Sequence, residues 1–266
     1  MKLIVHTADY GMTDSCTDGT LKAIRDGILN SVGFMANNTC SERAAKEILK
    51  YPHVSVGQEI NLVSGFPITD PKKIPSLVNA EGRLLTSRER FKISMGETFD
   101  YEEVLLETEN QVLRFKELFG YLPLSLFGHS YGTPNSNKAR AEITAKYKLP
   151  IGPQQHPLLR NEIPRWYIEI PGQKEAYTWQ HQIDTDVESW ILEDKLQLLK
   201  RDYGLFSTHT GFVDEELMLM STFTAIRYKE VHALTSPRVK QWIKDNNVQL
   251  INYKEFLDEI GYEYGV

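Results

Sequence analysis

Four short apolar segments each end at a side chain that can bind a metal ion or move a proton. The end residues are Asp9, Glu59, His129 and His209, and the run before each is typical of a β-strand. Because the carboxyl ends of parallel strands share one face, where αβ proteins build their active sites, we expect these side chains to converge. The first hypothesis is therefore a metal-assisted enzyme.

Carboxylate and imidazole ligands together suit zinc, manganese, iron or cobalt. Three protein ligands leave positions open for a water and for a substrate oxygen, which is the arrangement of catalytic sites. Such an ion lowers the pKa of a bound water from about 15.7 toward about 7 and polarises a carbonyl group. His209 could then protonate a leaving amine. The predicted reaction class is hydrolysis of an amide or ester.

Each residue also has a simpler explanation. Asp9 could cap the following helix or form a salt bridge, and Glu59 could belong to an ion pair at a strand end. His129 and His209 lie in turn-rich segments after strands, where functional residues are common. Only the placement of all four at strand ends favours a shared site.

The first sixty residues alternate between strand and helix patterns. Strands are expected at residues 2–6, 31–35 and 54–59, with helices at 14–28 and 41–50 between them. This β-α-β-α-β order is typical of a parallel sheet or barrel.

Two long stretches lack a regular pattern, residues 63–98 and 150–182. Loops of this length are more often lids or binding loops than plain connectors. The second stretch contains aromatic rings that could stack on a sugar, or pack in the core or at an oligomer contact, namely Trp166, Tyr167, Tyr177 and Trp179.

The remaining segments continue the αβ pattern. A helix begins at Asp100, where Glu103 completes a pattern close to a capping box, and ends at Gly120. The other expected elements are a strand at 122–127, a helix from Asn135, a helix at 185–201, a strand at 203–209, helices at 214–233 and 236–246, and a strand at 248–252. With no repeat or linker in the sequence, we predict one α/β domain over residues 1–266.

The composition excludes several classes of partner. Lys and Arg number 30 against 36 Asp and Glu, and no basic run suggests nucleic acid or a membrane surface. The sequence lacks a long apolar stretch, and Cys16 and Cys40 have no metal or redox spacing. We expect that the short apolar run at residues 1–6 is not a signal peptide. We expect a cytoplasmic protein that acts on a small molecule, and a homodimer is left open.

The same segments resemble the YdjC/ChbG-type carbohydrate deacetylases, distant relatives of the NodB-type polysaccharide deacetylases. The family's opening motif, Ala-Asp-Asp-Phe-Gly after a strand, aligns without a gap with Lys2-Leu-Ile-Val-His-Thr-Ala-Asp-Tyr-Gly11. Val54-Ser-Val-Gly-Gln-Glu-Ile-Asn-Leu62 is similar to its Gly-Leu-His-Leu-Asn-Leu strand. Phe127-Gly-His-Ser-Tyr-Gly-Thr-Pro134 and Ser207-Thr-His-Thr-Gly-Phe-Val-Asp214 are similar to its two later histidine motifs. The likeness covers nearly the whole chain in the right order.

The resemblance implies a distorted TIM-like (β/α) barrel that removes an acetyl group from an N-acetylated amino sugar or oligosaccharide. It also implies one divalent metal ion, with zinc, magnesium or manganese as the expected choices. The family's metal ligands fall on Asp9, Glu59 and His129, and its proposed acid falls on His209.

Three positions depart from the family pattern. Ala8 replaces the Asp regarded as the family's general base, Glu59 replaces a His ligand, and Tyr131 replaces a second His. Asp14, Asp18 or Glu59 could substitute for the base, and Asp14 is the residue that we predict as catalytic beside His209. The alternative is a non-catalytic or re-purposed member of the family that binds a metal or a sugar.

Overall fold

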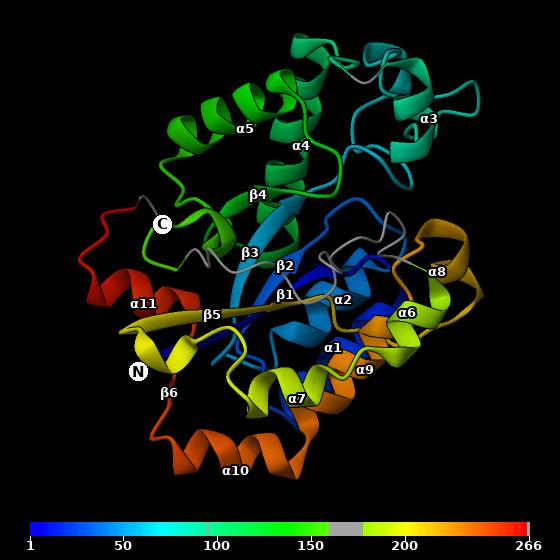
Figure 1. Cartoon of the computed structure of the whole chain (residues 1–266). Helices are drawn as coiled ribbons and strands as arrows, with labels where there is room; N and C mark the ends of the chain where they lie inside the picture. The colour runs from blue at the N-terminus through cyan, green and yellow to red at the C-terminus, as the bar shows by residue number, and fades with distance from the viewer. Residues whose placement is uncertain (95, 160–177, 265–266) are drawn as a thin grey trace.

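The computed structural model describes residues 1–94, 96–159 and 178–264 and shows helices arranged around parallel strands (Figure 1). The predicted α/β class with a parallel sheet is therefore confirmed. Three of the aromatic residues named above, Trp166, Tyr167 and Tyr177, lie outside the described residues. Within the described ranges, no helix is long and apolar enough to cross a membrane.

In the described part of the chain, six strands form one sheet, and every pairing between them is parallel. The order is β4-β3-β2-β1-β5, and β6 pairs with the first residues of β1. Among the described residues the pairings form a path with two ends, so they show the parallel sheet of the predicted barrel but not its closure. The strands are β1 (Lys2–Tyr10), β2 (Ser31–Phe34), β3 (Ser55–Ile60), β4 (Leu126–Gly128), β5 (Tyr203–Thr208) and β6 (Gln249–Leu250).

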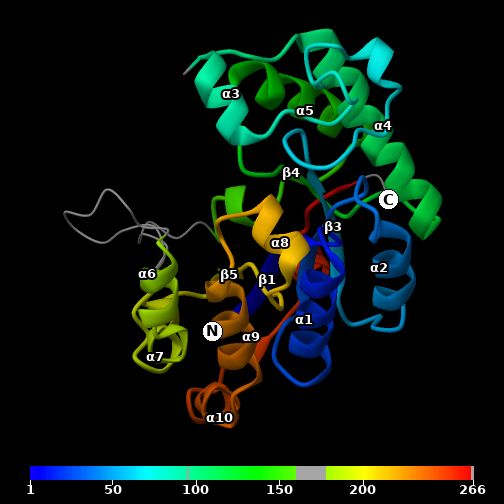
Figure 2. The ribbon, with the colours of Figure 1, turned by 90° about the vertical axis from the view of Figure 1, so that its right-hand side faces the viewer.

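Helices and 3₁₀ turns connect these strands and cover the sheet. Figures 1 and 2 show α3, α4 and α5 gathered beyond β4, while α1 and α9 lie side by side below the strands. The helices are α1 (Asp14–Arg25), α2 (Ser41–Ile48), α3 (Ser87–Ile93), α4 (Tyr101–Phe119), α5 (Pro134–Tyr147), α6 (Trp179–Asp184), α7 (Val187–Leu192), α8 (Glu215–Met220), α9 (Ala225–Thr235), α10 (Pro237–Asp245) and α11 (Tyr253–Glu259).

The predicted helix over residues 185–201 is wrong in extent. It is α7 followed by a turn and a short 3₁₀ helix at Leu198–Lys200. Asp194 and Gln197 take left-handed φ values of 47° and 52°, and the Asp194 carboxylate accepts the N–H of Leu198 at 2.7 Å. A residue in this conformation ends an α-helix, because the next N–H no longer reaches the carbonyl four residues back.

The predicted helix over residues 214–233 is divided into α8 and α9. Side chains take the backbone N–H groups between the two helices: Ser221 Oγ accepts from Phe223, and Gln182 Oε1 accepts from Thr224. Local side-chain acceptors of this kind compete with helical hydrogen bonds. The break sets the direction of α9, and therefore the place of the residues that α9 sends toward the sheet.

The stretch predicted to be irregular, residues 63–98, contains α3 and is attached to the segment that follows β4. Ser87 Oγ lies 3.1 Å from Ser130 Oγ, and the Tyr131 hydroxyl lies 3.2 Å from Thr98 Oγ1. Glu97 accepts the N–H of Asn135 at 2.7 Å. These contacts make this stretch a wall fixed beside the loop that carries His129.

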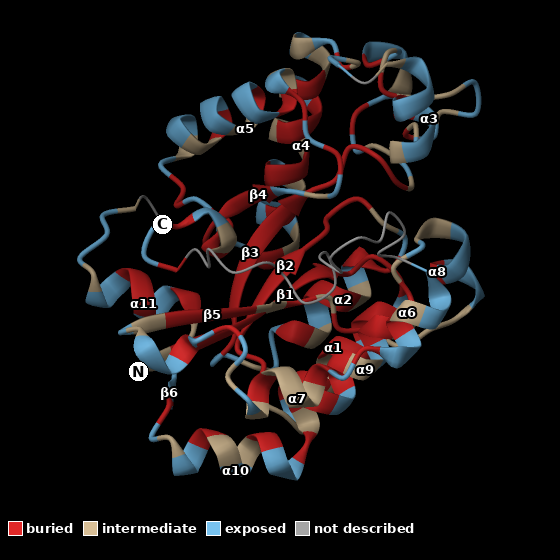
Figure 3. Cartoon of the chain, in the orientation of Figure 1, coloured by how far each residue is buried: buried red, intermediate tan, exposed pale blue. Residues whose placement is uncertain are grey.

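The buried residues concentrate along the strands (Figure 3). Eight of the nine residues of β1 are buried, as expected for a strand with parallel neighbours on both sides. Its carboxyl end therefore emerges in a region where an ionisable side chain is shielded from water.

Candidate metal centre

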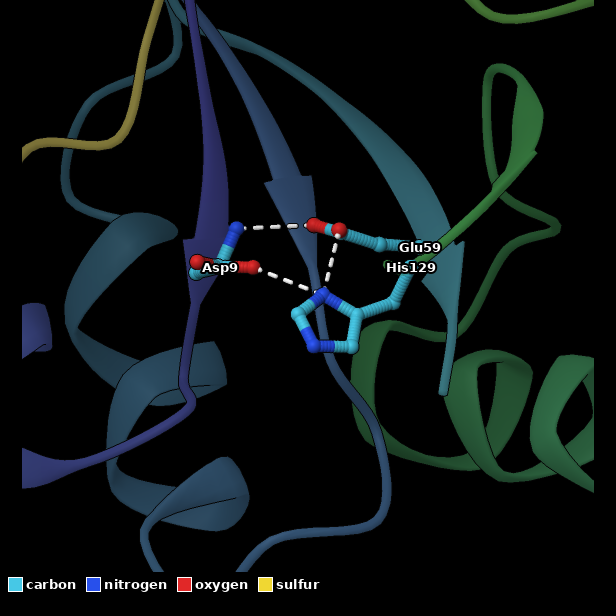
Figure 4. A group of neighbouring side chains, drawn as sticks. All are labelled: Asp9, Glu59 and His129. Atoms are coloured by element: carbon cyan, nitrogen blue, oxygen red, sulfur yellow. Dashed lines mark hydrogen bonds and ion pairs between the residues drawn. The ribbon is translucent and has the colours of Figure 1, made fainter. Parts of the chain in front are cut away.

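Asp9, Glu59 and His129 meet at the carboxyl ends of β1, β3 and β4 (Figure 4). His129 Nδ1 lies 3.0 Å from Asp9 Oδ1 and 3.0 Å from Glu59 Oε1. One donor atom from each residue lies within 4.8 Å of the other two. The structure thus brings together three of the four strand-end residues in a single cluster.

An irregularity in β1 aims Asp9 at its neighbours. Between Thr7 and Tyr10, β1 contains one residue more than the paired interval of β2, as in a β-bulge. Within this interval Asp9 takes a left-handed φ of 62°. Asp tolerates this conformation better than most residues, and bulges often redirect a side chain at a functional site. The local turn also directs the Asp9 N–H to Glu59 Oε2, at 2.7 Å.

Each carboxylate of the cluster therefore has one oxygen held by the protein. Glu59 Oε2 accepts the backbone N–H of Asp9, and Asp9 Oδ2 accepts from Arg227 Nη2 at 2.5 Å. The other oxygen of each carboxylate faces His129 Nδ1. Outer contacts of this kind orient metal ligands and fix which atom is presented.

The sequence analysis did not identify Arg227. Its side chain comes from the first turns of α9, is only 2% exposed, and forms with Asp9 the salt bridge that was the alternative explanation for that residue. It also donates to the Phe223 carbonyl at 2.7 Å. Nothing in the sequence around residue 227 distinguishes this arginine from a surface one.

The charges in the cluster shift its pKa values strongly. Burial raises the pKa of Asp9, but Arg227 and His129 outweigh burial and hold it well below its ordinary value. Burial, then the neighbouring Asp9, raises the pKa of Glu59. Burial lowers the pKa of His129, yet the two carboxylates outweigh it and raise that pKa to about 10. The two carboxylates therefore favour the protonated form of His129.

The donor set and spacing fit a divalent metal ion. Two ligand atoms about 2.1 Å from a tetrahedral ion lie about 3.4 Å apart. The observed spacing of 3.0 Å between His129 Nδ1 and each carboxylate oxygen is only a few tenths of an ångström shorter.

His209 follows β5 at the same end of the sheet. Its backbone N–H donates to Glu230 Oε2 at 2.6 Å, and its ring lies edge-on to Phe223 with 5.0 Å between the ring centres. Its charge contributes to the low pKa of Asp9, so it lies within electrostatic reach of the cluster. Glu230, like Arg227, comes from α9 and was not identified from the sequence.

The structure does not bring Asp14 to the other predicted site residues. Asp14 is the first residue of α1, its side chain is 64% exposed, and it lies 3.3 Å from Arg43 Nε. Asp18 also pairs with Arg43. The helix cap explains this: Thr13 Oγ1 accepts the N–H of Cys16, which fixes a helix direction that turns Asp14 outward.

Comparison with known proteins gives the chain a family. The model of the YdjC-like protein family matches residues 2–245. Carbohydrate deacetylase 2 of Listeria innocua is 28% identical over 264 residues, covering 96% of this chain and 98% of that protein. The chitooligosaccharide deacetylase of Yersinia pestis is 27% identical over 256 residues, covering 93% and 96%.

A solved structure shares the fold. It is a protein of Enterococcus faecalis, provisionally named a cellobiose-phosphate cleavage protein, and it aligns with a TM-score of 0.73 over 96% of this chain and 98% of that chain. The two sequences are 20% identical, so this likeness concerns the fold alone. The family match, which spans nearly all of the chain, shows that the protein belongs to the YdjC-like family, whose curated relatives include carbohydrate deacetylases.

Proposed function

We propose that this protein is a metal-dependent hydrolase that removes the acetyl group from an N-acetylated amino sugar or a short oligosaccharide of such sugars. Membership of a family with carbohydrate deacetylases supports the reaction class. The curated name of the Yersinia pestis relative supports a chitooligosaccharide-like substrate.

The observation that carries the proposal is that the two oxygens of each carboxylate have different partners. Each of Asp9 and Glu59 has one oxygen engaged by a protein donor and the other directed at His129 Nδ1. A structural ion pair needs only two side chains of opposite charge. Here three side chains of the types that bind metals each present one donor atom to the same place, as expected of a preformed set of metal ligands.

Asp9, Glu59 and His129 would hold the divalent ion, which would supply Lewis acidity toward the substrate carbonyl and lower the pKa of a bound water so that hydroxide is available. The two carboxylates favour zinc, magnesium or manganese over softer ions. Arg227 offsets the charge of Asp9, which limits the negative charge that the cluster presents to the substrate.

His209 has the role of the acid that protonates the leaving amine. It comes from a neighbouring strand end, and Glu230 holds its backbone through a short hydrogen bond. Imidazole is a common general acid in enzymes, and a protonated ring would give its proton to the nitrogen as the C–N bond breaks.

The reaction also needs a residue that takes the proton from the attacking water. Ala8 stands where the related family has its base, and both Asp14 and Asp18 are exposed and paired with Arg43. Glu59 is the member of that predicted group that lies in the cluster, and its Oε2, which accepts the N–H of Asp9, is the oxygen that does not face His129.

The test combines metal content with acetate release. Elemental analysis of the purified protein should find close to one divalent ion per chain, and N-acetylglucosamine oligomers should release acetate. His129→Ala should lose both metal and activity. A wild-type protein that binds neither zinc nor manganese after soaking would exclude the proposal.

A second candidate function is sugar or metal binding without turnover. The specific observation in its favour is Ala8, a small apolar residue at the family's base position. Stoichiometric metal together with sugar binding, but no acetate release from acetylated sugars or simple esters, would favour this second function over the first.

A further inference from the structure

A cavity lies beside β4, the strand at one edge of the sheet. Its volume is about 730 Å³, within the range typical of small-molecule sites. One wall is α5, the opposite wall is the C-terminal segment Tyr262–Tyr264, and its lining contains none of the three candidate metal ligands. We call this space the α5 groove.

Arg140 of α5 lines the α5 groove and lacks an acidic partner among the residues that the structure describes. Its Nη2 donates to Asn137 Oδ1 at 2.7 Å. The better-buried arginines differ: Arg227 pairs with Asp9, and Arg90 donates to three backbone carbonyls. Burial lowers the pKa of Arg140 with no carboxylate to oppose it. A bound anion would stabilise a half-buried guanidinium that has no other acidic partner.

Gly128 leaves the space that the Arg140 guanidinium occupies. A Cβ atom at residue 128 would lie 2.3 Å from Arg140 Nη1, so any side chain there would displace the guanidinium. Gly128 is the last residue of β4 and immediately precedes His129. The charged group is therefore packed against the strand that also delivers a metal ligand, while its donors border the cavity.

The rest of the α5 groove suits an anion attached to a polar body. Lys148, in the left-handed cap after α5, adds a second positive charge, and it too has no ion pair with a described residue. Glu263 is the acidic residue in the lining, so the groove keeps a net positive charge of one. Thr144 adds a hydroxyl group and Tyr262 adds an aromatic ring, and proteins use both kinds of group to bind sugars.

We infer that the α5 groove binds a sugar-sized molecule that carries a carboxylate or phosphate group, with Arg140 as the residue that holds the oxyanion. This binding site is separate from the candidate metal centre and does not depend on the proposed deacetylase activity. The planar fork of arginine matches either oxyanion in a bidentate manner, and Lys148 adds a point charge.

Calorimetric titration of the full-length protein tests the inference, with glucose 6-phosphate and glucuronate as anionic probes and glucose as the neutral one. Each titration is repeated after EDTA treatment, so that an ion at Asp9, Glu59 and His129 does not account for phosphate binding. Arg140→Gln should weaken binding of the anionic probes roughly 10- to 100-fold, the effect of a charge-assisted hydrogen bond. Arg140→Lys should retain an intermediate affinity, because the charge remains but the fork is lost.

Lys146→Gln is the matched control. It removes one positive charge from the same helix, but Lys146 pairs with Glu109 and does not line the groove. Its effect should be within about twofold, since exposed charges are screened. Equal affinity of wild type and Arg140→Gln for the probes would overturn the inference. So would failure of the wild type to bind either anionic probe at millimolar concentration, or binding of glucose as tight as that of the anions. The tighter of the two anionic probes identifies the preferred oxyanion.

Discussion

Arg227 and Asp9 form a buried ion pair, with Nη2 and Oδ2 2.5 Å apart and each side chain 2% exposed. The two residues are separated by 218 positions, so the pair ties α9 to the carboxyl end of β1. It holds one oxygen of a candidate metal ligand and neutralises part of its charge.

Removal of this arginine should destabilise the fold. Arg227→Met leaves a buried carboxylate without its partner, and we expect a loss of about 3–5 kcal/mol in the free energy of unfolding. Urea denaturation of the metal-free proteins measures it. Arg238→Met is the control, because Arg238 pairs with Glu188 at a surface where its side chain is 71% exposed. Similar stability for the two variants would contradict the role assigned to the buried pair.

Metal content should depend on His129. Because each of three side chains offers one donor atom, loss of the imidazole removes one of three protein ligands, and His129→Ala should contain little metal after dialysis. His53→Ala, at an exposed loop position, should keep the wild-type content. Elemental analysis reports both. Metal retained in full by His129→Ala would place the ion elsewhere.

Metal affinity should rise with pH. The carboxylates of Asp9 and Glu59 raise the pKa of His129 to about 10, so at neutral pH an incoming ion has to displace a proton. Each binding event then releases about one proton, and the apparent affinity should increase about tenfold per pH unit between about pH 6 and 8. Zinc titration against a competing chelator measures this slope. An affinity independent of pH would show that the imidazole is already neutral.

Restoring an acidic residue at position 8 should raise deacetylase activity. Ala8 is 5% exposed and directly precedes Asp9, and a positioned base typically contributes about 10²–10⁴-fold. We expect a gain in acetate release for Ala8→Asp, greater still when combined with Glu59→His. Asp14→Asn should change the rate by less than about twofold, because this side chain is exposed and paired with Arg43. A folded, metal-loaded double variant with no gain would count against deacetylation as the reaction.

His209 can be tested through the leaving group. If its imidazole protonates the leaving amine, His209→Gln should slow deacetylation of an amino sugar by about 10²–10⁴-fold. The same variant should retain much of the activity toward p-nitrophenyl acetate, whose leaving group departs without protonation. Equal losses on both substrates would assign His209 to substrate binding or to the structure of the site.

The positions of the strand ends could be predicted from the sequence, because a hydrophobic run and the residue that follows it are local features. Asp9, Glu59 and His129 could be placed at one edge from the βα alternation alone, since parallel strands share that edge. The extent of the helices in the second half was less predictable. Left-handed residues such as Asp194 and side-chain acceptors such as Ser221 divided segments whose composition favours continuous helices.

The outer contacts of the site could not be predicted. Arg227 and Glu230 reach the site because α9 points toward it, and the direction of α9 depends on the interruption of the helix between α8 and α9. Asp14 is close to Asp9 in sequence, yet the turn that starts α1 leaves its side chain exposed and paired with Arg43. Nearness along the chain carries little information across such a turn.

The conformation of Asp9 has a consequence for how the protein matures. Its left-handed backbone, its hydrogen bond to Glu59 and its pair with Arg227 involve protein groups alone. We therefore expect these contacts to form during folding and to leave the ligand set ready for an ion that binds afterwards. The relative abundance of competing ions, and not the order of events on the folding pathway, then decides which one is loaded.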